Sequence, residues 1–226
     1  MDLNYQEVYM KYGVFGASGR LGSEVIKLFE ENNHKLVFAY DLEGEWKNEN
    51  PDLIIDCSLQ EVFNTTIEYA CELNKPLIVA TTSLTEDHIA LMKKYSKQFP
   101  IVQSFNFSIG IQILLKLTEM ANEKLSDWDI EIIETHHRFK KDKPSGTAKM
   151  IQNIFDRKEI NTSSLRLGNV PGDHSVSFGG LGEVITISHR ALSRRTFAEG
   201  ILLSAQFVVN KESGFYSFTD VVFRSK

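Results

Sequence analysis

The sequence of 226 residues has little cysteine, no long apolar run and no excess of basic residues. Its two cysteines, Cys57 and Cys71, lack the spacing of metal ligands, which favours a reducing cytoplasmic location. No apolar run approaches the roughly 20 residues that a membrane-spanning helix needs. Residues 1–13 also lack the apolar core of a signal peptide. We therefore expect a cytoplasmic protein without a membrane partner.

The charge balance disfavours a nucleic-acid partner. Acidic residues outnumber basic ones by 30 to 25, which gives a net charge of -5, whereas proteins that bind a phosphate backbone are usually basic. Hydrophobic residues make up 42% of the chain. This content is enough to bury a core in one large domain or two modest ones.

The first half of the chain alternates short apolar runs with helical stretches. Apolar runs at residues 12–15, 35–40, 52–58, 76–82 and 100–107 are separated by segments with helical periodicity. Strands that read as continuous apolar runs with helices between them are typical of a parallel sheet covered on both faces. The pattern therefore predicts an α/β domain with a doubly wound, Rossmann-like parallel sheet.

From about Ser108 the pattern changes. A long helical stretch leads to a strand at residues 127–137, a basic loop, a helix near 147–158, and three strand-like segments separated by glycines. This order predicts an α+β domain with a mixed or antiparallel sheet. A final helix near residues 196–209 returns the chain to the first domain. We thus expect one domain of residues 1–107 and 195–226, and a second of residues 108–194.

A glycine-rich segment follows the first predicted strand and precedes a helix. Glycines at 16, 19 and 22 allow a tight turn and close approach to a pyrophosphate, and the helix N-terminus attracts the anion. Asp41 follows the second strand, where a carboxylate accepts hydrogen bonds from adenosine ribose hydroxyls. The alternative is a tight turn with a surface aspartate. The combination predicts a dinucleotide site.

The residues after Asp41 bear on which nucleotide is preferred. Leu42 and Glu43 supply no arginine for a ribose 2′-phosphate, and the Asp41 carboxylate would repel that phosphate. We therefore expect NADH to be preferred and NADPH to remain possible, with Lys47 as a cation that compensates in that case.

The second motif, Glu134-Thr-His-His-Arg-Phe-Lys-Lys-Asp-Lys-Pro-Ser-Gly-Thr-Ala148, groups proton donors and cations. Two histidines end a strand, a basic loop follows, and Ser145 opens a helix whose amides and hydroxyls suit a carboxylate. Alternatively, the histidines are a packing feature and the lysines a solvated charge run. Zinc is disfavoured because successive strand positions face opposite ways, so we expect no metal.

These motifs together resemble the dihydrodipicolinate reductase family (4-hydroxy-tetrahydrodipicolinate reductases). The resemblance rests on E-x-H-H-x-x-K-x-D-x-P-S-G-T-A at residues 134–148 and on G-x-x-G-R-x-G at residues 16–22, and it extends over nearly the whole chain. It implies reduction of a small cyclic dicarboxylate, 4-hydroxy-tetrahydrodipicolinate, by NAD(P)H with loss of water. The implied product is tetrahydrodipicolinate, on the diaminopimelate route to lysine. A homotetramer assembled through the sheet of the second domain is also implied.

The resemblance also implies a role for each matching residue. His136 and Lys140 would be catalytic. Substrate contacts would come from His137, Ser145, Gly146, Thr147 and Arg166. Cofactor contacts would come from Gly16, Ala17, Ser18, Gly19, Arg20, Leu21, Asp41, Ala80, Thr81, Thr82, Ser104, Phe105, Asn106 and Phe107. Because these sets fall in different predicted domains, we expect domain closure to bring them together.

Two other functions remain open from the sequence. One keeps the fold and cofactor but changes the substrate, as in a small amino-acid dehydrogenase. The other is a non-catalytic NADH-binding regulator, which retention of both His136 and Lys140 disfavours.

Overall fold

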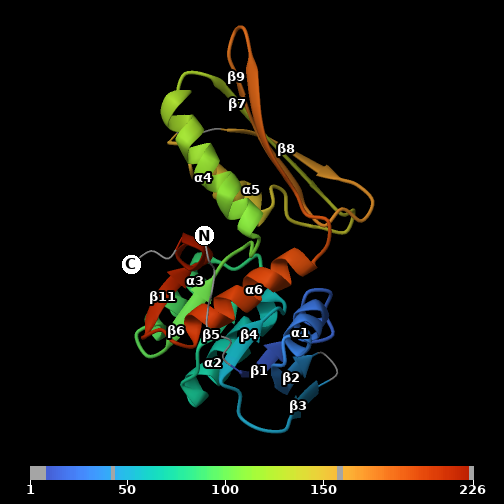
Figure 1. Cartoon of the computed structure of the whole chain (residues 1–226), viewed down its shortest axis with the longest axis vertical. Coiled ribbons are helices and arrows are strands. Elements are labelled where there is room, and N and C mark those ends of the chain that lie inside the picture. The colour runs from blue at the N-terminus through green and yellow to red at the C-terminus, as the bar shows by residue number, and fades with distance from the viewer. Residues whose placement is uncertain (1–8, 42–43, 157–159, 224–226) are drawn as a thin grey trace. The chain divides into compact units, whose positions relative to one another are not determined.

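The computed structural model describes residues 9–41, 44–156 and 160–223. They form two compact units, one comprising the described residues up to Phe107 and from Phe197 onward, the other Ser108–Thr196. Figure 1 labels the helices and strands of both units. Within the described residues, no helix combines the length and apolar character needed to cross a membrane.

The first unit contains a seven-stranded sheet in the order β11-β6-β5-β4-β1-β2-β3. Its strands are β1 (Lys11–Phe15), β2 (Lys35–Asp41), β3 (Gly44–Lys47), β4 (Leu53–Asp56), β5 (Leu77–Val79), β6 (Pro100–Gln103) and β11 (Gly214–Ser217). Neighbouring strands are parallel except for β3, which pairs antiparallel with β2 at one edge. The predicted doubly wound, Rossmann-like sheet is thus confirmed, with two edge strands, β3 and β11, that the apolar pattern does not reveal.

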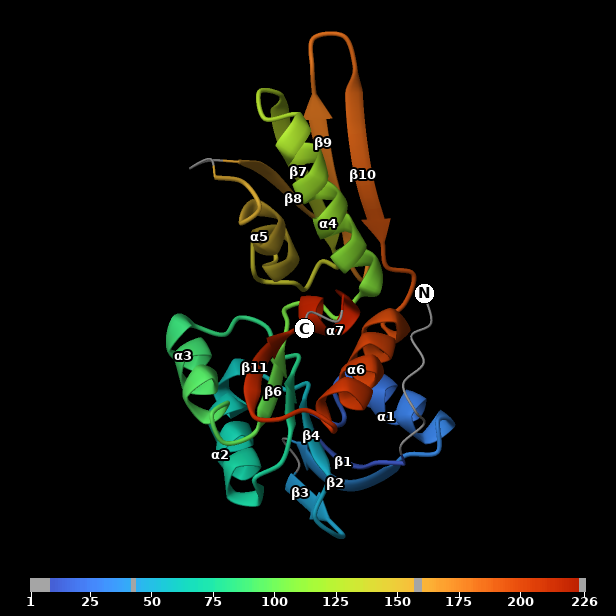
Figure 2. The ribbon, with the colours of Figure 1, turned by 60° about the vertical axis from the view of Figure 1, so that its left-hand side comes forward.

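Helices cover both faces of this sheet, as Figure 2 shows, with α2 and α3 on one face and α1 and α6 on the other. The helices are α1 (Gly22–Glu31), α2 (Phe63–Leu73), α3 (Glu86–Tyr95), α6 (Arg195–Val208) and α7 (Phe218–Phe223), with a 3-10 turn at Gln60–Val62 before α2. Side chains of α2 and α3 pack against Phe15, Phe38 and Ile54 of the sheet. Burial of these apolar side chains fixes the strand ends from which the loops emerge.

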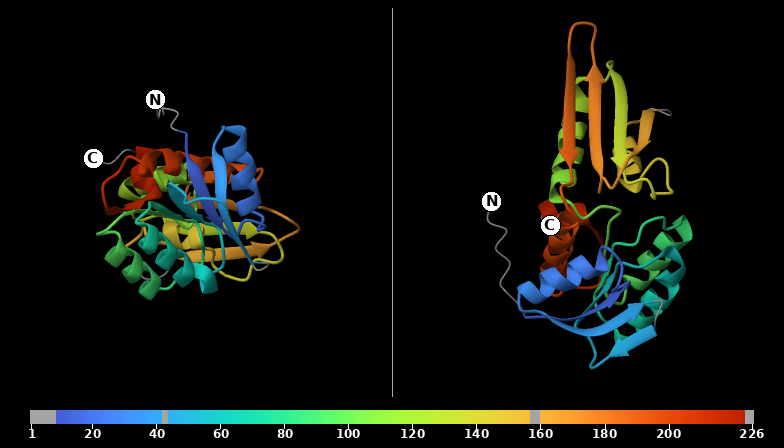
Figure 3. Two further views of the ribbon diagram at one scale, coloured as in Figure 1. Left: turned by 90° about the horizontal axis from the view of Figure 1, so that it is seen from below. Right: turned by 90° about the vertical axis from the view of Figure 1, so that its right-hand side faces the viewer.

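The second unit contains a four-stranded sheet in the order β10-β9-β7-β8. Its elements are α4 (Ile109–Lys124), β7 (Asp129–His136), α5 (Gly146–Gln152), β8 (Asn161–Arg166), β9 (Asp173–Gly179) and β10 (Val184–Arg190). The β7/β8 pair is parallel, whereas β7/β9 and β9/β10 are antiparallel, so the predicted mixed sheet is confirmed. Figure 3 shows α4 lying along one face of this sheet.

Strand β7 keeps its two-residue alternation to its last residue. Ile130 and Ile132 are buried under α4 and α5, and the next two inward positions are occupied by the polar residues Glu134 and His136, which are also buried. The alternation continues through these polar residues because Glu134 and His136 hydrogen-bond to each other.

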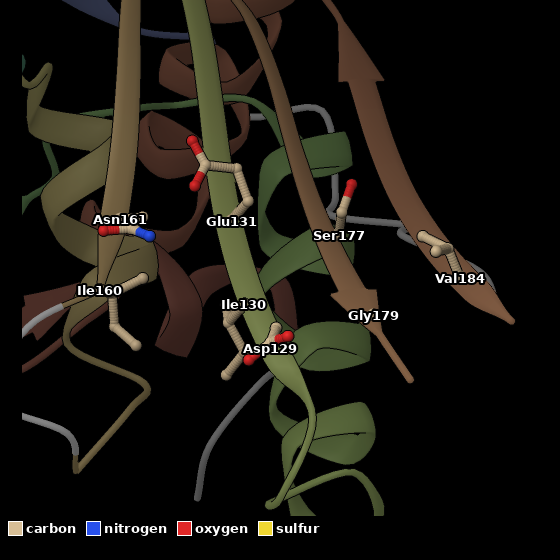
Figure 4. Close-up of a pocket in the computed structure, with 8 residues that line it drawn as sticks. All are labelled: Asp129, Ile130, Glu131, Ile160, Asn161, Ser177, Gly179 and Val184. Atoms are coloured by element: carbon tan, nitrogen blue, oxygen red, sulfur yellow. The ribbon is translucent and has the colours of Figure 1, made fainter. Parts of the chain in front are cut away.

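Among the residues that the structure describes, no helix covers the opposite face of this sheet (Figure 4). Figure 4 shows Glu131 and Ser177 on this side, in front of strands that have α4 behind them. A pocket on the sheet is lined by Asp129, Ile130, Glu131, Ile160, Asn161, Ser177, Gly179 and Val184. Ile133 and Leu165 lie on the same face of the sheet as Glu131, and both are exposed. This face therefore presents mixed polar and apolar side chains to the solvent.

Candidate active site

The glycine-rich loop joins β1 to α1 and is packed tightly against neighbouring backbone. Gly16 has a φ of +79°, and a Cβ there would lie 2.7 Å from the carbonyl oxygen of Cys57. A Cβ on Gly22 would lie 2.0 Å from the carbonyl oxygen of Gly16. Because such distances are sterically forbidden, these two positions require glycine. The loop is thereby held close to the start of α1, which is where phosphate groups bind in this fold.

Asp41 lies at the end of β2, beside this loop. Its carboxylate accepts a hydrogen bond from the backbone N–H of Ser18. The N–H of Gly16 donates to the carbonyl of Tyr40 at 2.8 Å, which fixes the same two segments together. The side chain of Asp41 therefore reaches the loop as the dinucleotide hypothesis requires. Leu42 and Glu43, on which the expected cofactor preference depends, lie outside the described residues.

The other predicted cofactor residues follow β5 and β6 at the same edge of the sheet. Thr81 donates from its hydroxyl to the carbonyl of Ser58 at 3.2 Å, and the Ser104 N–H donates to the carbonyl of Val79 at 3.3 Å. Ser104 Oγ also donates to the carbonyl of Asn106 at 2.8 Å. Within this unit the structure therefore brings the segments 16–21, 80–82 and 104–107 to the carboxyl ends of parallel strands, where doubly wound folds bind ligands.

Sequence reasoning missed Asp56, a buried carboxyl group at the carboxyl end of the central strand β4. It ends β4, and its Oδ1 accepts hydrogen bonds from the N–H and hydroxyl of Ser58. Burial raises the pKa of Asp56, against the opposing effect of hydrogen bonds from Ser58 and Thr81. Its position in the sequence, directly after the apolar residues 53–55, was the signal that could have identified it. Asp56 orders the two loops beside the glycine-rich segment.

In the second unit, the predicted catalytic His136 lies in a buried polar cluster. Its Nδ1 is hydrogen-bonded to Oε2 of Glu134, and its ring centroid lies 5.1 Å from that of His174. Burial would raise the pKa of Glu134, but hydrogen bonds from His136, Arg166 and Ser164 lower it to about 2. Glu134 is therefore ionised at neutral pH and accepts from the imidazole.

Arg166, predicted to contact the substrate, is hydrogen-bonded to groups of the protein itself. Its Nη1 and Nη2 each donate to one oxygen of Glu134 at 2.9 Å. Its remaining N–H groups donate to the carbonyls of Lys140 at 3.1 Å, Leu165 at 2.7 Å and Asp142. All five N–H groups are thus used within the protein. Direct binding of a substrate carboxylate would require Arg166 to give up one of these partners.

Lys140 follows the end of β7 in the loop anchored by Arg166. Its ammonium group lies 2.8 Å from Oδ1 of Asp142, and its side chain is 16% exposed. His137, the neighbour of His136, is half-buried with its ring centroid 6.3 Å from that of Phe139. Lys140 therefore combines a positive charge with limited solvent access, which suits a group that transfers a proton to a bound anion.

Helix α5 begins with the predicted substrate residues. The Ser145 hydroxyl accepts from the N–H of Ala148 at 3.1 Å and lies 3.2 Å from Nε2 of His174. Thr147 is buried, and Gly146 is half-buried. His174, which sequence reasoning did not place in the site, has a pKa lowered to about 3 by burial and by the neighbouring His136. A neutral His174 thus connects the start of α5 to His136.

Among the described residues, no group of three histidine, cysteine, aspartate or glutamate side chains is arranged to hold a metal ion. The second unit instead offers an imidazole, an ammonium group and hydroxyls that converge around the ends of β7 and β8. These groups can exchange protons and donate hydrogen bonds to an anionic ligand.

Comparison with known proteins covers almost the entire chain. A family model described as "Dihydrodipicolinate reductase, N-terminus" matches residues 10–107, and one described as "Dihydrodipicolinate reductase, C-terminus" matches residues 110–222. The 4-hydroxy-tetrahydrodipicolinate reductase of Thermosipho africanus is 45% identical over 213 residues, which cover 94% of this chain and 98% of the relative. The 4-hydroxy-tetrahydrodipicolinate reductase of Wolinella succinogenes is 35% identical over an alignment of 252 residues, which covers 94% of this chain and 98% of the relative.

A solved structure agrees at the level of the fold. Dipicolinate-bound dihydrodipicolinate reductase from Paenisporosarcina sp. TG-14 aligns with a TM-score of 0.71 at 22% identity, covering 93% of this chain and 98% of that one. Together, the two family models and the relatives show that the chain belongs to the dihydrodipicolinate reductase family of pyridine-nucleotide-dependent oxidoreductases.

Proposed function

We propose that the chain reduces 4-hydroxy-tetrahydrodipicolinate to tetrahydrodipicolinate with loss of water, in lysine biosynthesis by the diaminopimelate route. The observation that carries this proposal is the similarity to relatives named for that substrate, at 45% identity across 94% of the chain. The burial of Glu134, His136, Ser145 and Thr147 within the motif supports it, because the motif supplies proton-exchanging groups and anion contacts together.

The proposed cofactor site consists of Gly16 to Leu21, Asp41, Ala80 to Thr82 and Ser104 to Phe107. When bound there, a reduced pyridine nucleotide supplies a hydride. The glycine-rich loop would bind the pyrophosphate through backbone N–H groups, and the Asp41 carboxylate would accept hydrogen bonds from ribose hydroxyls. Because that carboxylate would repel a 2′-phosphate, we propose that NADH is preferred and that NADPH is also used.

The proposed substrate site lies in the second unit. The reaction consumes one hydride and one proton per substrate and releases the 4-hydroxyl oxygen as water. We assign this proton transfer to Lys140 and His136, because ammonium and imidazole groups can act as general acids. His137, Ser145, Gly146 and Thr147 would bind the two carboxylates through charge-assisted and neutral hydrogen bonds. Domain closure over both sites stays a prediction.

We also propose that the protein is a cytoplasmic homotetramer. Support for assembly comes from the uncovered face of the β10-β9-β7-β8 sheet, which exposes Ile133 and Leu165. The two free cysteines suit a reducing compartment. Light scattering on the purified chain measures the assembly, and a monomer at micromolar concentration would contradict this part of the proposal.

A spectrophotometric assay of NADH consumption with freshly generated substrate tests the activity. We expect turnover with NADH and slower turnover with NADPH. Turnover on an amino acid but not on the cyclic dicarboxylate would favour the dehydrogenase alternative. Tight NADH binding without turnover would favour the regulator.

A further inference from the structure

A buried pair of opposite charges lies beside the two proposed catalytic residues. Glu134 on β7 is fully buried, and the Arg166 side chain on β8 is 9% exposed. They pair through two 2.9 Å hydrogen bonds in a bidentate arrangement. We infer that Glu134 and Arg166 are positioning residues, which set the tautomer of His136 and hold the loop that carries Lys140.

The carboxylate of Glu134 determines which ring nitrogen of His136 carries a hydrogen. An ionised carboxylate only accepts hydrogen bonds, so Nδ1 of His136, which faces Oε2, must be the protonated nitrogen of the neutral ring. Nε2 is then left for proton exchange. A Cβ on Gly172 would lie 3.1 Å from this nitrogen, so the glycine keeps the space beside it open.

Arg166 connects the same carboxylate to the Lys140 loop. Its Nε donates to the carbonyl of Lys140 at 3.1 Å, and its Nη2 donates to the carbonyl of Asp142. Asp142 in turn lies 2.8 Å from the Lys140 ammonium group. The backbone on both sides of Lys141 is thus fixed to a buried charge pair. The arrangement couples the orientation of the imidazole to the position of the ammonium group.

The strand register makes this coupling direct. His136 and Arg166 are paired neighbours on the parallel strands β7 and β8, and Glu134 lies two residues earlier on the same face of β7. A bidentate guanidinium fits this spacing, whereas a lysine ammonium cannot donate to both carboxylate oxygens and two loop carbonyls in one plane. The pair is therefore specific for glutamate and arginine rather than for any two opposite charges.

The catalytic assignments for His136 and Lys140 rest on the proposed function, so the test includes a measurement that does not require turnover, the tautomer of His136. Histidine labelled with ¹⁵N distinguishes the two neutral tautomers by NMR. In Glu134→Gln, Arg166 retains the amide oxygen, and the amide NH₂ then faces Nδ1 as a donor. We expect the wild-type ring to be protonated on Nδ1 and the variant ring on Nε2, with kcat/KM lower by roughly 10²- to 10⁴-fold.

Arg166→Lys tests the second half of the inference and retains a cation beside Glu134. We expect the His136 tautomer to be preserved, amide hydrogen exchange in residues 138–143 to become faster, and kcat to fall at least about tenfold. If Arg166 instead binds substrate directly, the affinity for pyridine-2,6-dicarboxylate falls while kcat and amide exchange stay unchanged. That result would overturn the positioning role.

Glu119→Gln is the matched control, since it removes an ion-paired but exposed carboxylate from α4 in the same unit. We expect it to leave the tautomer, kcat and loop exchange unchanged. An unchanged tautomer in folded Glu134→Gln would overturn the first half of the inference. If the wild type shows the expected tautomer but no turnover on the cyclic dicarboxylate, the proposed function fails while the positioning inference stands.

Discussion

The backbone N–H of Ser18 donates a hydrogen bond to the carboxylate of Asp41, and this bond joins the glycine-rich loop to the end of β2. Asp41 therefore has two consequences for a bound dinucleotide. In the proposed site its negative charge would face the ribose, and its hydrogen bond fixes the loop expected to bind the pyrophosphate. Substitutions that keep the hydrogen bond but remove the charge separate these effects.

Asp41→Asn keeps an oxygen that accepts from Ser18 and removes the charge. We expect the KM for NADH to rise about tenfold, because a charged hydrogen bond to the ribose is replaced by a weaker neutral one. The kcat/KM ratio of NADPH to NADH should rise, since repulsion of the 2′-phosphate is lost. Asp41→Ala should raise the KM further while leaving kcat largely intact. Steady-state kinetics with both cofactors measure this, and a parallel fall in kcat would contradict the ribose role.

Gly22→Ala tests the close packing of the loop. The added methyl group would lie 2.0 Å from the carbonyl oxygen of Gly16, so the loop must move. We expect a loss of at least about 1–3 kcal/mol in the free energy of unfolding together with weaker NADH binding. Gly182→Ala, where no heavy atom lies within 4 Å of the added Cβ, is the control. Urea unfolding and NADH fluorescence titration report the two effects, and normal NADH affinity in Gly22→Ala would argue against the loop as the phosphate site.

Lys140→Ala should lower kcat/KM by roughly 10²- to 10⁴-fold, because a positioned proton donor and a substrate charge contact are both lost. Lys141→Ala is matched in sequence and chemistry, but its side chain is exposed and we assign it no catalytic role. We expect activity near that of the wild type for this control. A decrease of less than about threefold in Lys140→Ala would remove Lys140 from the mechanism.

The fold was predictable where burial determined the pattern. All four residues of β4 are buried, as a central parallel strand requires, and its apolar run is evident in the sequence. In contrast, all four residues of β3 are exposed, and this edge strand is defined only by its pairing with β2. No periodic apolar signal marks it. Strand β11, at the opposite edge, was not predicted either, because its four residues are all half-buried and carry no alternation.

The candidate site shows the same division between local and long-range information. The glycine loop and Asp41 were predictable because they follow two strands whose carboxyl ends meet at one edge. The pairing of Glu134 with Arg166 was not, since the residues are separated by 32 positions and meet only through the register of β7 and β8. The sequence therefore predicted a substrate contact for Arg166 and gave no sign of its bond to Glu134. Two of its donors bond to Glu134, and the other three bond to the backbone carbonyls of Lys140, Leu165 and Asp142.

The pKa of Glu134 also predicts a pH-dependent contribution to stability. Its folded value of about 2 lies below the ordinary 4.5, so the stabilisation is fully present above about pH 4.5 and is lost as the pH falls toward 2. The difference corresponds to roughly 3 kcal/mol for this fully buried group. We expect the gap in unfolding free energy between the wild type and Glu134→Gln to narrow between about pH 5 and pH 3. Urea unfolding at several pH values measures this gap, with Glu119→Gln as the exposed comparison. A gap independent of pH would mean that Glu134 is not held as a paired carboxylate in the folded state.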